Sequence, residues 1–155
     1  MSVSLARNPI FAQRLYYEAT TASQTIATST TTIADLPASA TYDNGLALAG
    51  TAMHDGTNNR CYLRRAGIWH VFVSTSWAVN GTGLRRVDIV LNGTTTIAAN
   101  VNNNYGGFFG TFHSTETLYY ASGTGDYVDC RVNQSSGGNL ATTSILKATW
   151  LGPIA

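Results

Sequence analysis

The stretch that decides the fold is GIWHVFVSTSW, residues 67–77. Its residues alternate between two sets, which a strand places on opposite faces. One set comprises Trp69, Val71, Val73, Thr75 and Trp77; the other comprises Ile68, His70, Phe72, Ser74 and Ser76. A period of two, with β-branched and aromatic residues, predicts a strand and excludes a helix. Because the second set is half apolar, we expect that face to contact another layer or another subunit.

Shorter segments of the same kind occur on both sides of this strand. The sequence predicts strands at 15–17, 25–27, 30–33, 60–63, 84–91, 94–98, 115–120, 127–132 and about 141–151. Turns are expected at 42–45, 54–59, 123–126 and 133–139, and Asn92-Gly93 is the clearest hairpin signal. About eight to ten short strands separated by turns predict an all-β sandwich, jelly roll or barrel.

The composition agrees with an all-β domain and excludes several classes of protein. The 155 residues suffice for one domain, and only 11% of them are charged, with a net charge of +1. This balance argues against a nucleic-acid-binding protein, which usually has a basic stripe. The sequence contains no apolar run long enough to span a membrane and no secretory signal pattern. A polar surface built from Thr, Ser, Asn and Gly is typical of capsid, fibre and adhesion modules.

Residues with chemical reactivity are few, and their spacing does not indicate catalysis. The carboxylates form no obvious acid–base pair, and no Gly-x-Ser-x-Gly motif occurs. We therefore expect no enzyme activity, no metal site and no cofactor. His70 is expected to be a hydrogen-bonded structural residue, and His54 and His113 to lie in loops or at sheet edges. A cation held by His54 with Asp55, or a calcium ion at Asp43 or Asp55, remains a weaker alternative.

The cysteines and the paired arginines are expected to have structural rather than functional roles. Cys130 alternates with valines in its strand, so we expect a buried thiol, and a disulfide to Cys61 stays open. The pairs Arg64-Arg65 and Arg85-Arg86 are expected to be solvated or salt-bridged rather than an anion-binding patch.

Two segments stand apart from the strand pattern. Residues 1–14 show no period and are interpreted as an arm preceding a domain at 15–155, with Pro9, Ile10 and Phe11 as its attachment residues. Tyr105, Phe108 and Phe109 lie in a loop rich in Gly and Asn. They are expected to be buried against a neighbouring subunit, with contact to a ligand as the alternative.

The order of several motifs resembles one superfamily. These motifs are Gln24-Thr25-Ile26, Tyr42-Asp43-Asn44-Gly45, Ala66-Gly67-Ile68-Trp69-His70-Val71, Asn92-Gly93, Gly125-Asp126-Tyr127-Val128 and Ala148-Thr149-Trp150-Leu151-Gly152. Together they resemble the tumour necrosis factor and complement globular-head superfamily, with Trp69 where Tyr is usual. The resemblance implies a ten-stranded antiparallel jelly-roll sandwich that assembles as a compact homotrimer. It makes Phe72, Tyr119 and Tyr127 candidates for the trimer contact.

The Thr- and Asn-rich surface and the closing Trp-Leu-Gly-Pro also resemble small domains of bacteriophage virion proteins. This implies a non-enzymatic module in the virion, docked to other virion proteins through its arm. The module would either bind host-surface carbohydrate, as a minor tail protein does, or decorate the capsid. A bacterial lectin-like adhesion module is the alternative, and a polysaccharide depolymerase is a more remote one.

Overall fold

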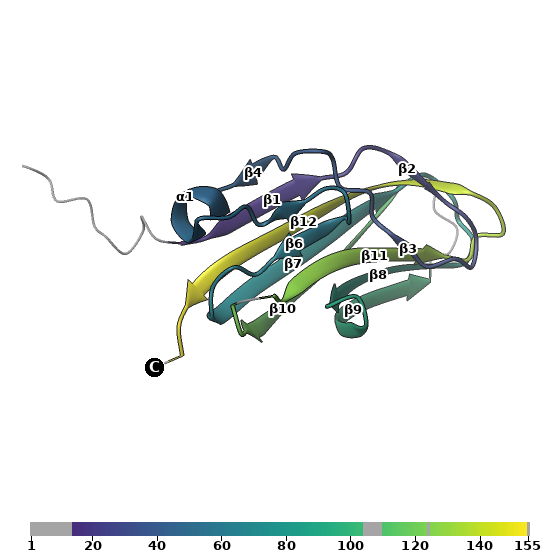
Figure 1. Cartoon of the computed structure of the whole chain (residues 1–155). Coiled ribbons are helices and arrows are strands. Elements are labelled where there is room, and N and C mark those ends of the chain that lie inside the picture. The colour runs from purple at the N-terminus through teal and green to yellow at the C-terminus, as the bar shows by residue number, and fades with distance from the viewer. Residues whose placement is uncertain (1–13, 104–109, 124, 155) are drawn as a thin grey trace, which may run out of the picture.

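The computed structural model describes residues 14–103, 110–123 and 125–154 and shows two antiparallel sheets that pack face to face (Figure 1). The first, sheet A, has the order β10 (Thr111–Ala121), β7 (Gly67–Trp77), β12 (Leu140–Gly152), β1 (Tyr16–Thr20) and β4 (Tyr42–Asp43), and β2 (Gln24–Ile26) also pairs with β12. The second, sheet B, has the order β5 (His54–Asp55), β6 (Arg60–Tyr62), β11 (Tyr127–Gln134), β8 (Leu84–Leu91) and β9 (Thr95–Asn103), and β3 (Thr32–Ile33) pairs with β11. The predicted all-β sandwich is confirmed.

The core lies between the sheets and is built from alternate residues of the long strands. In β7 the buried set is the predicted one, and Trp69, Val71, Val73 and Trp77 are at most 1% exposed. Sheet B contributes residues of the same inward parity, including Val87, Ile89, Val128, Cys130 and Val132. Both cysteines are buried and unbonded, so the buried Cys130 thiol is confirmed and no bridge to Cys61 forms.

The two largest differences from the predicted strand boundaries are in β9 and β10. Strand β9 continues to Asn103, where a loop is predicted from residue 100, because residues 100–103 pair with 84–87 of β8. Pairing with a neighbouring strand overrides the low β-propensity of asparagine. Strand β10 begins at Thr111 rather than 115 for the same reason, since it pairs along the whole length of β7.

A short helix, α1 (Gly45–Ala49), follows the predicted turn at 42–45. The Asp43 carboxylate accepts the N–H groups of Gly45, Met53 and His54 at 2.7–2.8 Å, which anchors both ends of this connection. Because Met53 and His54 lie 10 and 11 residues beyond Asp43 in the sequence, local periodicity does not reveal α1. No helix in the described part of the chain is long and apolar enough to cross a membrane.

Leu15 anchors the start of the described chain to sheet A, while the division into an arm at 1–14 and a domain at 15–155 stays a prediction. Leu15 is fully buried, and its carbonyl accepts the N–H of Trp150 at 2.9 Å. Strands β1 and β12 therefore place the two ends of the described chain side by side, at the end of the sandwich where α1 lies (Figure 1). The proposed attachment residues Pro9, Ile10 and Phe11 lie outside the described residues.

Candidate functional site

The outward face of sheet A exposes large apolar side chains. Strand β10 contributes Phe112, Leu118 and Tyr120, which are 81%, 64% and 50% exposed. Half-buried residues of the adjacent strands β7 and β12 share this face because Tyr120 pairs with Ile68 and Ser74 pairs with Ile145. We call this set the apolar face; it comprises Ile68, Phe72, Phe112, Leu118, Tyr120 and Ile145. On an antiparallel sheet whose outer face contacts only water, these positions would usually carry polar side chains.

The charged side chains on this outward face pair with each other. His70 and Glu116 approach to 2.9 Å, and Lys147 lies 3.1 Å from Glu18. The Tyr16 hydroxyl donates to Glu18, and this bond, with Lys147, lowers the pKa of the Glu18 carboxyl. Each acid thus has a base beside it. The apolar face therefore carries little net charge to repel a second copy of the chain.

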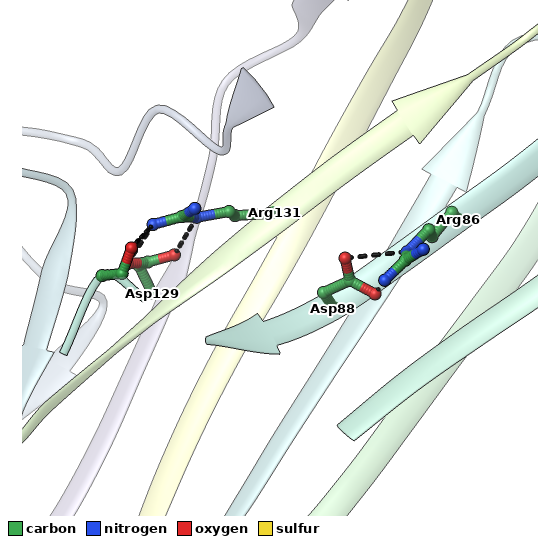
Figure 2. Close-up of polar contacts among 5 residues, drawn as sticks. Arg86, Asp88, Asp129 and Arg131 are labelled. Carbon is green, nitrogen blue, oxygen red and sulfur yellow. Dashed lines mark hydrogen bonds and ion pairs between the residues drawn. The ribbon is translucent and has the colours of Figure 1, made fainter. Parts of the chain in front are cut away.

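The outward face of sheet B carries an internally neutral set of charges instead (Figure 2). Arg86 donates from Nε to both carboxylate oxygens of Asp88 at 2.8 Å, and Arg131 Nε donates to Asp129 at 2.9 Å. Asp88 pairs with Arg131 across β8 and β11, so opposite charges lie opposite each other. Arg131 also donates to the carbonyl of Gly93 at 2.7 Å, which ties the predicted Asn92-Gly93 turn to this face. The arrangement is structural, and it leaves no basic patch.

A cluster of tyrosines and arginines lies at the β6 end of sheet B. The rings of Tyr62 and Tyr127 meet edge-on with centroids 5.7 Å apart. The Arg60 guanidinium lies 4.3 Å from the Tyr127 ring and that of Arg64 lies 4.0 Å from the Tyr62 ring. An open hollow of about 620 Å³ adjoins this cluster. Its polar lining residues are Thr51, His54, Asp55, Thr57, Tyr62 and Arg64.

Both ring nitrogens of His54 make hydrogen bonds within the fold, so His54 is not available to bind a cation. Its Nε2 donates to the Pro37 carbonyl at 2.8 Å, since a carbonyl can only accept, and its Nδ1 lies 2.9 Å from the Tyr17 hydroxyl. Both ring nitrogens are therefore occupied. The described residues contain no group of three His, Cys, Asp or Glu side chains that could hold a metal ion.

The other histidines and Arg85 refine the sequence predictions. His70 is hydrogen-bonded as predicted, although it is half-exposed on the outward face. His113 lies on the edge strand β10 but points inward and is only 5% exposed; burial, with Arg85 nearby, lowers its pKa. The prediction of a solvated or salt-bridged pair holds for Arg86 and is wrong for Arg85, which is fully buried.

The candidate contact residues do not lie on one surface. Phe72 belongs to the apolar face, Tyr119 points inward and packs against the core opposite Trp69, and Tyr127 lies in the sheet B cluster. The loop residues Tyr105, Phe108 and Phe109 lie outside the described residues. Phe112, Leu118 and Tyr120 were not predicted from the sequence, although they lie an even number of residues apart in β10 and therefore share one face.

The fold matches known structures at low sequence identity. The globular domain of zebrafish complement 1qA protein superposes with a TM-score of 0.62 and 9% identity, covering 91% of this chain and 99% of that one. Eiger TNF from S. frugiperda gives 0.62 and 10% identity over 92% and 94%, and murine APRIL gives 0.58 and 12% over 89% and 99%. Comparison of the sequence with family models and with curated proteins finds no match. The chain therefore has the jelly-roll fold of the complement and tumour necrosis factor domains.

Proposed function

We propose that this chain is a non-enzymatic jelly-roll module that assembles as a homotrimer through the outward face of sheet A. The observation that carries the proposal is the apolar face, where Phe112, Leu118 and Tyr120 remain exposed on a fold whose core is already complete. Domains of this fold are commonly homotrimeric and serve in binding, and the fold is typically non-enzymatic. A second copy of the chain is the occupant whose chemistry fits, because both partners then bury apolar side chains without bringing like charges together.

We further propose that the trimer belongs to a bacteriophage particle, as a tail receptor-binding module or a capsid decoration, held by residues 1–14. The Thr- and Asn-rich, charge-poor composition and the closing Trp150-Leu151-Gly152-Pro153 support this assignment. The hollow beside Tyr62 and Arg64 supports contact with host-surface carbohydrate, since tyrosine rings and guanidinium groups suit sugar hydroxyls and carboxylates. The same hollow would serve a bacterial lectin-like adhesion module.

The trimer is tested by light scattering on the purified chain at several concentrations. We expect a mass of three chains that does not change with concentration. Leu118→Asp places a second carboxylate on the apolar face, opposite His70, which already pairs with Glu116, and should give a folded monomer, because burying a carboxylate in the contact costs several kcal/mol. Val101→Asp is the matched control, since Val101 is 49% exposed on β9 of the other sheet and its variant should remain trimeric.

A monomeric wild-type protein at every concentration would overturn the proposal. A trimer that survives Leu118→Asp would move the contact away from the apolar face. Circular dichroism of both variants establishes that the fold is intact before the masses are compared.

A further inference from the structure

Arg85 is a fully buried cation that has only neutral partners in the described part of the chain. Its Nη1 donates to the carbonyls of Thr82 and Leu84 at 2.9 and 2.8 Å, and its Nη2 donates to the carbonyl of Asn80 at 3.0 Å. Carbonyl dipoles accept these protons but do not neutralise the charge. A buried charge without a counterion is costly, and burial lowers the pKa of Arg85 accordingly.

The carboxylates of the chain do not supply the missing negative charge. The sequence has eight Asp and Glu side chains, all within the described residues, and each is engaged elsewhere. Their contacts are Glu18 with Lys147, Asp35 with Asn59, Asp43 with Met53, Asp55 with Asn58, Asp88 with Arg86, Glu116 with His70, Asp126 with Asn92 and Asp129 with Arg131.

Three residues at this place also have buried polar atoms with no hydrogen-bond partner among the residues that the structure describes: Trp77 Nε1, Arg85 Nε and Thr111 Oγ1. Trp77 and Thr111 are direct partners across β7 and β10, and the Arg85 guanidinium carbon lies 5.8 Å from the centroid of the Trp77 ring. The indole and guanidinium N–H groups can only donate, and the hydroxyl can donate as well. A buried donor without an acceptor destabilises the folded state, so these groups favour a shared acceptor.

We propose that Arg85, Trp77 and Thr111 bind a small inorganic anion, a halide such as chloride, inside the sandwich. A halide accepts from several donors at once and neutralises the arginine. A water molecule would accept the same bonds but would leave the charge uncompensated and bring two protons of its own that need acceptors. The inward-facing His113, whose pKa Arg85 helps to lower, adds a second nearby group that an anion would stabilise in its charged form.

The first test is crystallographic and uses bromide as the probe. Crystals of the full chain grown or soaked in sodium bromide are measured at the bromine absorption edge. We expect an anomalous peak within hydrogen-bonding distance of Arg85 Nε and Trp77 Nε1. Density that refines as water with no anomalous signal would overturn the proposal.

The second test measures thermal unfolding in solution at constant ionic strength. Sodium bromide replaces sodium methanesulfonate, whose anion is too bulky for an interior site. A ligand that binds only the folded state raises the melting temperature by mass action, here by about 2–4 °C at bromide concentrations well above Kd. A melting temperature that does not respond to bromide would contradict binding in solution.

The variants separate this site from general salt effects. Arg85→Met removes the charge and should abolish both the peak and the bromide response, while Arg86→Met on the outward face should preserve both. If Arg85→Met does not fold, Thr111→Val and Trp77→Phe each remove one donor. Either should raise the bromide concentration for the half-maximal shift by about 5-fold, which corresponds to one lost hydrogen bond. A response unchanged in both variants would overturn the assignment of the site. None of these outcomes depends on the proposed trimer.

Discussion

Arg85 and Arg86 are neighbours in strand β8 but point to opposite faces of the sheet, and this decides the role of each charge. Consecutive residues of a strand point to opposite faces, so Arg86 reaches Asp88 on the outward face while Arg85 enters the core. The same rule places Asp129 beside Arg131 on the outward face of sheet B, although the side chain of Asp129 is only 2% exposed there. Burial rather than distance then determines how much each ion pair contributes to stability.

At the residue scale, Asp129→Asn is therefore expected to destabilise the domain by about 1–3 kcal/mol, because it replaces the buried, ionised acceptor of Arg131 with a neutral amide that has one accepting oxygen. Glu116→Gln is the matched control, since the His70–Glu116 pair is largely exposed and its loss should cost under about 1 kcal/mol. Urea unfolding of both variants measures the difference. Equal losses would show that the pair on sheet B contributes no more than a surface contact.

At the scale of elements, the glycines where β7 begins and β12 ends make a sharp comparison. Gly67 and Gly152 have φ values of +132° and +147°, which strain any other residue. A Cβ on Gly67 would lie 2.3 Å from the carbonyl oxygen of Gly152, whereas a Cβ on Gly152 would meet nothing within 4 Å. The two positions thus share the backbone cost and differ in the clash.

We expect Gly152→Ala to cost about 1–3 kcal/mol from backbone strain alone. Gly67→Ala should cost clearly more, because the start of β7 must also move away from β12. Thermal unfolding of the two variants tests this order, and a Gly67→Ala protein as stable as Gly152→Ala would show that the strand ends separate freely.

Elements defined by a long local pattern are predicted from the sequence, and elements that depend on distant partners are not. Strand β7 is predicted with its observed bounds because its alternation is long and its two faces differ clearly. The extension of β9 and the helix α1 depend on partners distant in sequence, so local pattern does not predict them. The burial of Arg85 could have been predicted, because it alternates with Val87 and Ile89, whose side chains lie in the core. Phe72 is the candidate contact residue that lies on the apolar face.

At the scale of the whole molecule, the small number of charges makes the response to pH simple to interpret. His113 is buried, and its lowered pKa means that the unfolded chain binds its proton more readily than the folded chain. Stability from this group is thus present above its unfolded pKa of about 6.5 and is lost as pH falls through the lower folded pKa. Glu18, Asp55 and Asp126, whose pKa values are also lowered, lose their contribution only at more acidic pH.

We therefore expect the melting temperature to begin to fall as the pH drops below about 6.5, before the carboxylates titrate. His113→Gln should flatten this segment while leaving the fall at lower pH in place. Thermal scans across the pH range in halide-free buffer measure both effects. A wild-type profile that is flat down to pH 5 would mean that His113 is protonated in the folded protein.

The pairing of β1 with β12 has a mechanical consequence. Because the strands are antiparallel and their outer ends meet at Tyr16 and Thr149, a force that pulls the two ends of the domain apart acts on one hydrogen bond at a time. The strands would unzip from that end at low force. A force applied between one end of the chain and the opposite end of the sandwich would instead shear all the hydrogen bonds between β1 and β12 at once. The direction of the force therefore decides how long the domain stays folded.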